Sequence, residues 1–158
     1  MGNKEENLKL FWPKNAPDIS QVSKYINKYK NEKIVIKCGG KVLIDPNLFD
    51  NFIEDISVLY KLGLKVIIIH GGGPRIKEEL AKLNIESEFI NGLRVTNKQT
   101  MEVVEKALVD FNIEIIKKLE KKNCKSEGLN VSTNNVIIVD QENKNLGFVG
   151  MPRKIFNE

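Results

Sequence analysis

The sequence predicts an α/β protein whose central sheet is mainly parallel. Residues 34–36 and 66–69 are short apolar runs with the β-branched composition of buried strands. A segment of helical periodicity lies between them, opened by Asp45 and Pro46. Because two buried strands joined through a helix form the βαβ unit of a parallel sheet, we expect the strands to be neighbours. The prediction is an open three-layer αβα sandwich with helices on both faces and β-hairpins beside it.

Length and composition limit the classes of protein. With 158 residues, the chain suits one lobe over residues 19–158, preceded by an irregular extension over residues 1–18. The 25 basic and 21 acidic residues give a net charge of +4, without the basic and aromatic clusters typical of nucleic-acid binding. No apolar run approaches the ~20 residues that span a bilayer. The two distant cysteines fit a reducing cytoplasm, where we expect the protein to be.

Local signals mark the ends of the first two helices. Pro17 and Asp18 open a helix before the first strand, and its apolar positions have helical spacing: Val22, Tyr25, Ile26 and Tyr29. Asp45 and Pro46 open the helix between the strands, and Gly63 is the residue type that ends one. Both helices therefore have predicted starts that do not depend on tertiary contacts.

A short helix and a hairpin follow the second strand. Residues 74–83 have helical periodicity, with three leucine or isoleucine side chains expected to face inward: Ile76, Leu80 and Leu83. Asn91 and Gly92 are a strong signal for a type I′ turn between two short strands. This turn places Arg94 on the return strand.

The rest of the sequence predicts a long helix and a final hairpin. Thr96 and Gln99 have the spacing of a capping box, and Asn123 is the expected end of the helix that they open. Residues 136–139 predict a further strand, and residues 146–150 predict a hairpin arm.

Both core strands run directly into glycines. Gly39 and Gly40 follow the first strand, and Gly71, Gly72 and Gly73 follow the second. Ligands bind open α/β sheets at the carboxyl ends of the strands, and the free N–H groups at a helix start attract anions. A turn that needs glycine for positive φ is the alternative interpretation. Two such loops in one βαβ unit favour a shared anion-binding crevice.

Three side chains near these loops are candidates for the site. Lys37 ends a strand expected to be buried, where an ammonium group needs an anionic partner. Arg94 has the guanidinium that grips carboxylates in pairs of hydrogen bonds, although a surface ion pair is the alternative. His70 is expected to orient the second loop, and contact with the ligand is the alternative. We identify no metal-ligating cluster.

Other glycine-rich signatures do not fit. A P-loop needs a serine or threonine after Gly40 and Lys41, where the chain has Val42. The dinucleotide fingerprint that starts at Gly71 fails at its third glycine, because Ile76 stands there. The oxyanion loop of lipases needs a catalytic serine in G-x-S-x-G, which the sequence lacks.

Three motifs together resemble the N-acetylglutamate kinases of the amino acid kinase family. They are Lys37-x-Gly39-Gly40, the segment 70–74 and the segment 91–96. The resemblance covers about residues 19–150 and corresponds to the amino-terminal half of a family member. It implies that the nucleotide-binding carboxyl-terminal lobe is absent from these residues.

The resemblance also implies roles for the candidate residues. Gly72 and Gly73 would hold N-acetyl-L-glutamate through backbone N–H groups, and Arg94 would bind its α-carboxylate. Lys37 would stabilise the transition state, with the phosphate-loop glycines beside it: Gly39, Gly40 and Gly71. The implied reaction moves the γ-phosphoryl group of ATP, with Mg²⁺, to the side-chain carboxylate and yields N-acetylglutamyl 5-phosphate for arginine biosynthesis. The acceptor has a reference pKa of about 4.3, so no general base is needed.

The resemblance leaves two readings open. One is a kinase completed by a second chain that supplies the nucleotide lobe, and a homo-oligomer is also an expected form of association. The other is a noncatalytic acetylglutamate-binding or regulatory module, or a truncated product without activity alone. A related acidic acceptor would suit the Arg94 contact equally well.

Overall fold

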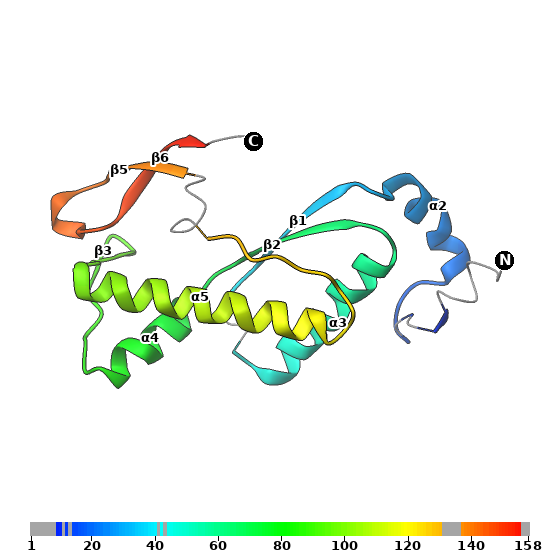
Figure 1. Ribbon diagram of the computed structural model, residues 1–158, viewed down its shortest axis with the longest axis horizontal. Coiled ribbons are helices and arrows are strands. Elements are labelled where there is room, and N and C mark those ends of the chain that lie inside the picture. The colour runs from blue at the N-terminus through cyan, green and yellow to red at the C-terminus, as the bar shows by residue number, and fades with distance from the viewer. Residues whose placement is uncertain are drawn as a thin grey trace. The chain divides into compact units, whose positions relative to one another are not determined.

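The computed structural model describes residues 9, 10, 12, 14–40, 42, 44–130 and 137–155 (Figure 1). It is an α/β structure, and the chain divides into two compact units. The first comprises residues 1–70 and 118–125, and the second comprises residues 71–117 and 126–158, in both cases as far as they are described. The elements are α2 (Ile19–Tyr29), β1 (Lys33–Cys38), α3 (Pro46–Lys61), β2 (Lys65–His70), α4 (Gly73–Lys82), β3 (Phe89–Ile90), β4 (Leu93–Arg94), α5 (Lys98–Glu120), β5 (Ile137–Gln141), a 3-10 turn (Lys144–Leu146) and β6 (Gly150–Ile155).

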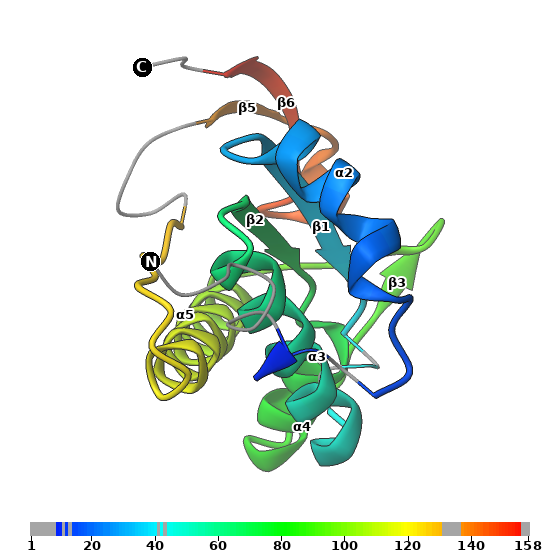
Figure 2. The same ribbon diagram turned by 90° about the vertical axis from the view of Figure 1, so that its right-hand side faces the viewer.

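The predicted βαβ unit is present in the first unit. β1 and β2 pair in parallel without a register shift, from Lys33 opposite Lys65 to Cys38 opposite His70. Figure 2 shows the two strands side by side, and α3, which connects them, packs against β2. Neighbouring parallel strands joined through a helix are therefore confirmed.

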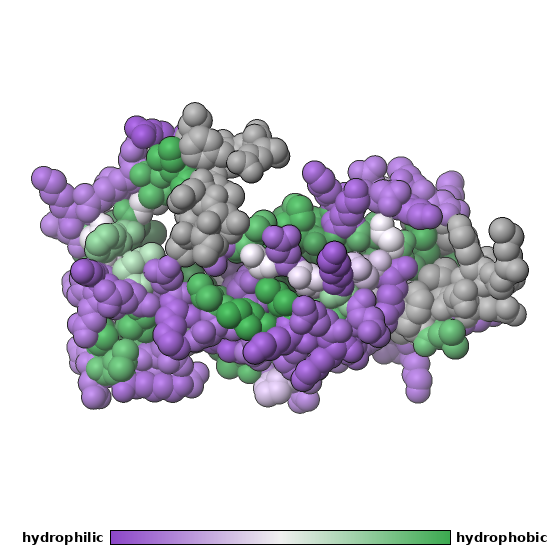
Figure 3. Space-filling view, viewed as in Figure 1, coloured by the Kyte–Doolittle hydropathy of each residue, from purple (hydrophilic) through white to green (hydrophobic). Residues whose placement is uncertain are grey.

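The two faces of this strand pair differ in burial. The side chains of Ile34, Ile36, Val66 and Ile68 are half-buried. On the opposite face, Val35 is 64% exposed, Ile67 43% and Ile69 51%. Hydrophobic colour is visible over β1 and β2 in Figure 3. The α/β class is confirmed, and one face of this strand pair is in part exposed, which an apolar run by itself does not indicate.

The helix ends of the first unit follow the local signals. Asp18 caps α2 by accepting a 2.8 Å hydrogen bond from the amide of Ser20. The Asp45 carboxylate accepts from the amides of Asn47 and Leu48 and caps α3. Gly63 follows this helix with φ +86°. These predicted starts and the predicted stop are confirmed.

In the second unit, α4 packs on α5. Ile76, Leu80 and Ala107 are buried together, with half-buried side chains around them: Ile85, Val103, Val104 and Leu108. Leu83, expected to face inward, is 58% exposed, because α4 ends at Lys82. α5 has 23 residues but is too charged to cross a membrane, and none of the described helices could do so.

The hairpins of the second unit meet beside the start of α5. Asn91 (φ 50°) and Gly92 (φ 82°) form the predicted turn between β3 and β4. β5 and β6 form an antiparallel hairpin, and a bridge between Thr96 and Gly147 connects the hairpin regions. The predicted strand residue 136 and the extension residues 1–8, 11 and 13 lie outside the described part of the chain.

The predicted capping box of α5 is wrong. The side chain of Asn97, not that of Thr96, accepts a hydrogen bond from the amide of Thr100 (2.8 Å). The Thr96 amide donates to the carbonyl of Leu146, and its hydroxyl donates to the carbonyl of Arg94. Because these contacts keep Thr96 in the bridge to Gly147, the helix starts after Asn97. Asn123, with φ 60°, follows the last turn as predicted.

Candidate functional site

The carboxyl ends of β1 and β2 lie side by side and lead into the two glycine loops. Cys38 pairs with His70, the last residue of β2, and Lys37 pairs with Ile69. Lys37 is exposed and makes no ion pair with any other described residue. The premise that its strand buries it is therefore wrong. Because its ammonium group remains in contact with water, folding does not desolvate it, and it is available to an external anion.

The first loop offers backbone and space. Gly39 is exposed, and no heavy atom lies within 4 Å of the position that a Cβ would take. Gly40 is half-buried. The next helix, α3, begins at Pro46, and the Asp45 carboxylate already binds its first free amides. The first loop therefore does not present a helix N-terminus.

The second loop does lead directly into a helix. Gly71 is exposed, Gly72 is the N-cap of α4, and Gly73 is its first residue. Gly72 has no side chain to cap the helix, and the first helical hydrogen bond runs from the Ile76 amide to the Gly72 carbonyl (2.8 Å). Amides earlier in the turn lack a side-chain cap, so this start can accept an anion.

Packing explains one glycine of the second loop but not the next. A Cβ at Gly72 would lie 2.5 Å from Leu108 Cδ2, whereas a Cβ at Gly73 would meet no heavy atom within 4 Å. Among the described glycines, positive φ occurs only at Gly63, Gly92 and Gly147. The turn interpretation, which requires positive φ, therefore does not explain the loop glycines. The space at Gly73 can admit a ligand close to the backbone.

The start of α4 is also held by an arginine that the sequence reasoning missed. Arg75 Nη1 lies 2.7 Å from Glu114 Oε2, and its guanidinium lies 4.0 Å from the ring centroid of Phe111. Phe111 is 1% exposed. Phe111 lies on α5, and its contact with Arg75 depends on how α4 packs, which no local pattern predicts.

Arg94 is ordered by its neighbours in the hairpin. It is half-buried, donates a hydrogen bond to Ser87 Oγ and stacks over the ring of Phe89 at 4.7 Å. It makes no ion pair with a described acidic side chain, so a surface ion pair does not explain it. The two-residue turn alone predicts the pairing of Arg94 with Phe89. The contact with Ser87 has no comparable sequence signal.

Two titratable side chains, Cys38 and His70, lie opposite each other at the ends of β1 and β2. Cys38 is 6% exposed, and burial raises the pKa of its thiol, which disfavours the thiolate. His70 is half-buried at the end of β2, and its expected role in orienting the loop stays a prediction. Within the described ranges, no group of three or more histidine, cysteine or acidic side chains could hold a metal ion.

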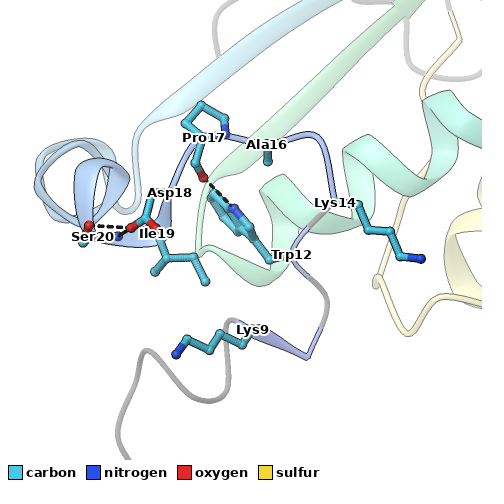
Figure 4. A pocket seen from close by; sticks show the side chains of 8 residues that line it. All are labelled: Lys9, Trp12, Lys14, Ala16, Pro17, Asp18, Ile19 and Ser20. Carbon is cyan, nitrogen blue, oxygen red and sulfur yellow. Dashed lines mark hydrogen bonds between the residues drawn. The ribbon is translucent and has the colours of Figure 1, made fainter.

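A separate cavity of about 480 Å³ lies next to the start of α2 (Figure 4). The indole N–H of Trp12 donates to the carbonyl of Pro17 at 2.8 Å. Hydrogen bonds from Ser20 lower the pKa of Asp18, whose carboxylate serves as the helix cap. The ammonium groups of Lys9 and Lys14 point in different directions. These groups do not converge on one point, and the cavity contains none of the predicted site residues.

Comparison with known proteins now decides the family. Residues 32–155 match the amino acid kinase family. The chain belongs to the amino acid kinase family. Its resemblance to this family, inferred from the glycine loops and the hairpin motif, is thereby confirmed.

Curated relatives in this family are acetylglutamate kinases. The chain is 52% identical to that of Pelagibacter ubique over 98% of its own length and 54% of the relative. It is 38% identical to that of Clostridioides difficile over 83% of its length and 46% of the relative. The chain spans about half the length of the curated relatives that it matches.

Two solved structures are similar to this chain in fold. An N-acetylglutamate synthase from Neisseria gonorrhoeae, complexed with coenzyme A and N-acetyl-glutamate, matches 87% of this chain and 32% of that chain. Its TM-score is 0.67 at 18% identity. The smu.665 protein of Streptococcus mutans matches 78% of this chain and 51% of that chain, with a TM-score of 0.61 at 28% identity.

Proposed function

We propose that this chain is the acetylglutamate-binding part of an acetylglutamate kinase. The reaction would transfer the γ-phosphoryl group of ATP to the side-chain carboxylate of N-acetyl-L-glutamate, forming N-acetylglutamyl 5-phosphate in arginine biosynthesis. Relatives that bear this name match the chain over nearly its whole length, which supports a kinase over a noncatalytic module.

The second glycine loop is the observation that carries the proposal. α4 starts without a side-chain cap, and the position of Gly73 is open. A carboxylate can approach the backbone there and accept hydrogen bonds from amides at the positive end of the helix dipole. Gly72 and Gly73 are the proposed contacts, with Gly71 at the entrance of the loop.

Arg94 is the proposed partner of the α-carboxylate. Phe89 and Ser87 fix the plane of its guanidinium, which reduces the entropy lost on binding. A planar guanidinium can bind both oxygens of one carboxylate. An acidic acyl amino acid is therefore the ligand class that suits this unit.

Lys37 is the proposed catalytic residue. The acceptor carboxylate is ionised at neutral pH, so the barrier comes from its repulsion with the phosphates. The exposed ammonium of Lys37 would neutralise charge on the transferring group, and the open backbone at Gly39, with the half-buried Gly40 beside it, would admit phosphate oxygens. Mg²⁺ bound with ATP supplies further charge neutralisation, and we assign it no ligand among the described residues.

The proposal places the protein in the cytoplasm, as a partner of another copy or of a chain that supplies nucleotide-binding residues. Cys38 and Cys124 are both buried and form no disulfide with each other, which suits that reducing compartment.

Titration calorimetry with N-acetyl-L-glutamate tests the binding role. Arg94→Ala removes the proposed carboxylate contact, and we expect the Kd to rise roughly a hundredfold. Arg153→Ala is the matched control, because Arg153 is an exposed arginine with one ion pair to Asp140 at 3.5 Å. Unchanged affinity in Arg94→Ala would remove Arg94 from the site.

A hydroxamate assay for acyl phosphate tests the catalytic role. We expect no product from this chain alone, and product when it is mixed with the remaining part of the Pelagibacter ubique relative. Lys37→Met should lower the rate at least about a hundredfold. Lys33→Met, an exposed lysine on the same face of β1, should change it less than about threefold. Equal losses in both variants would contradict the assignment of Lys37.

A further inference from the structure

Arg75 makes two contacts that fix its side chain. Its Nη1 atom lies 2.7 Å from Glu114 Oε2, and its guanidinium lies 4.0 Å above the centre of the Phe111 ring. The Arg75 and Glu114 side chains are 31% and 38% exposed, so water screens the pair only in part. Phe111 is 1% exposed and offers a fixed surface for stacking.

These contacts give Arg75 a role other than ligand binding. An arginine two residues after Gly73 would be a natural partner for an anion, but Glu114 already neutralises its charge. Leu108, Phe111 and Glu114 follow one another at intervals of three residues on α5, so each is a surface neighbour of the next. Leu108 meets the Gly72 backbone, and Phe111 and Glu114 meet Arg75. The whole first turn of α4 is thus attached to α5.

We propose that Arg75 is a positioning residue that holds the first turn of α4 against α5 and thereby orients the Gly72 and Gly73 amides toward an acidic ligand. This inference rests on the proposed function for the ligand, but the attachment itself does not depend on it. A helix start that has no side-chain cap would otherwise fray, because its first amides have no helical acceptor. Arg75 restrains the turn from outside and leaves these amides available.

Amide hydrogen exchange on the full chain tests the attachment directly. In Arg75→Met we expect exchange at Ile76 and Lys77 to become at least about fivefold faster, since the first turn opens more often. Lys82→Met is the matched control. It also removes one positive charge from α4, together with the ion pairs to Glu78 and Glu79, but Lys82 lies at the carboxyl end of the helix. Lys82→Met should leave the exchange at Ile76 and Lys77 within about twofold of the parent chain.

Calorimetry with N-acetyl-L-glutamate tests the consequence for binding. The Kd should rise roughly tenfold in Arg75→Met and less than about twofold in Lys82→Met. If the parent chain does not bind this ligand, the proposed function fails, whereas the exchange data still decide the role of Arg75. Equal exchange rates in Arg75→Met and Lys82→Met would overturn the inference.

Milder variants serve if Arg75→Met does not fold. Glu114→Gln removes the ion pair and keeps the stacking, and Arg75→Lys keeps the charge and loses the planar stack. Each should accelerate exchange at Ile76 by a smaller factor than Arg75→Met. The double variant Arg75→Lys, Glu114→Gln should accelerate it less than the product of the two single factors, because the substitutions act on one contact group. Two ineffective single variants would also overturn the inference.

Discussion

The two glycine loops look alike in sequence but differ in which group binds the helix amides that follow them. After the first loop, the Asp45 carboxylate binds the amides of Asn47 and Leu48. After the second loop, α4 starts at Gly73 with no side-chain cap. The amides at the start of α3 thus already bind a carboxylate of the protein itself. The amides at the start of α4 can accept an anion from a ligand.

This difference underlies the separate roles that we propose for the two loops. The first loop has the open backbone of Gly39 and the exposed ammonium of Lys37, and we propose it for the transferring phosphoryl group. The second loop begins a helix without a side-chain cap, and we propose it, with the ordered guanidinium of Arg94, for the carboxylate substrate. Glycine repeats alone therefore do not specify what a loop binds.

An acidic side chain introduced into the second loop should have the largest effect on ligand affinity. Gly73→Asp places a carboxylate in open space beside the uncapped amides, and we expect acetylglutamate affinity to fall about a hundredfold. Stability should rise by about 0.5 kcal/mol, because an acidic residue in the first turn complements the helix dipole. Calorimetry and urea unfolding measure the two changes.

Gly39→Asp is the control in the other loop and should change that affinity less than about threefold. Equal losses in the two aspartate variants would show that both loops bind the carboxylate.

A glycine-to-alanine substitution, which adds one methyl group, should change the stability of the protein differently in the two loops. Gly72→Ala puts a Cβ 2.5 Å from Leu108 Cδ2 and should lower the free energy of unfolding by about 2 kcal/mol. Gly39→Ala meets no atom within 4 Å and should cost less than about 0.5 kcal/mol. Urea unfolding compares them. The combination Gly72→Ala, Leu108→Ala should cost less than the sum of its parts, and strict additivity would count against this steric explanation.

Removing the Asp45 carboxylate, which follows the first loop, should have a smaller effect on stability. Asp45→Ala leaves two amides at the start of α3 without their partner, at a cost of about 1 kcal/mol. Asp45→Asn keeps an acceptor oxygen and should restore most of this stability. Chemical denaturation measures both variants, and an Asn variant as unstable as the Ala variant would argue against the cap.

The smallest expected effect is on the pH dependence of stability, through the ion pair between Glu54 of α3 and Lys122. A hydrogen bond from Lys122 lowers the pKa of Glu54 and raises that of Lys122. The Glu54 contribution is therefore present above its unfolded pKa of about 4.3 and is lost as pH falls through the lower folded value. The Lys122 contribution is present below about pH 10.4 and is lost as pH rises through the higher folded value.

Glu54→Gln should lower stability at pH 7 by about 0.5 kcal/mol, since both side chains are 44% exposed. Unfolding curves from pH 3 to pH 7 should converge for the two proteins at low pH. Glu78→Gln on α4, also in an exposed pair, is the control, and its unfolding curves should keep the parent's pH dependence between pH 3 and pH 7.

Local signals predicted most element ends correctly. Asp18, Asp45 and Gly63 act through hydrogen bonds or dihedral angles within a few residues, so their effect does not depend on distant parts of the chain. The turn at Asn91 and Gly92 likewise fixed the strand that carries Arg94. The candidate loops were found because glycine is informative directly after an apolar strand.

The errors concern residues whose environment comes from elsewhere in the chain. Thr96 has the sequence of a helix cap, but Leu146 and Gly147 hold its backbone in a bridge. Leu83 continues an apolar pattern beyond the end of its helix. Val35 is apolar and exposed, because the composition of a strand does not reveal whether a layer covers it.

The sequence by itself determined the α/β class, the parallel strand pair, the hairpin turn and the positions of both glycine loops, since all depend on short-range periodicity and backbone preference. Only the tertiary structure decided that a Cβ at Gly72 would overlap Leu108, that Gly73 is open and that Arg75 is held by Phe111 and Glu114. Those distinctions depend on the packing of α4 on α5, and packing joins residues that no local pattern connects.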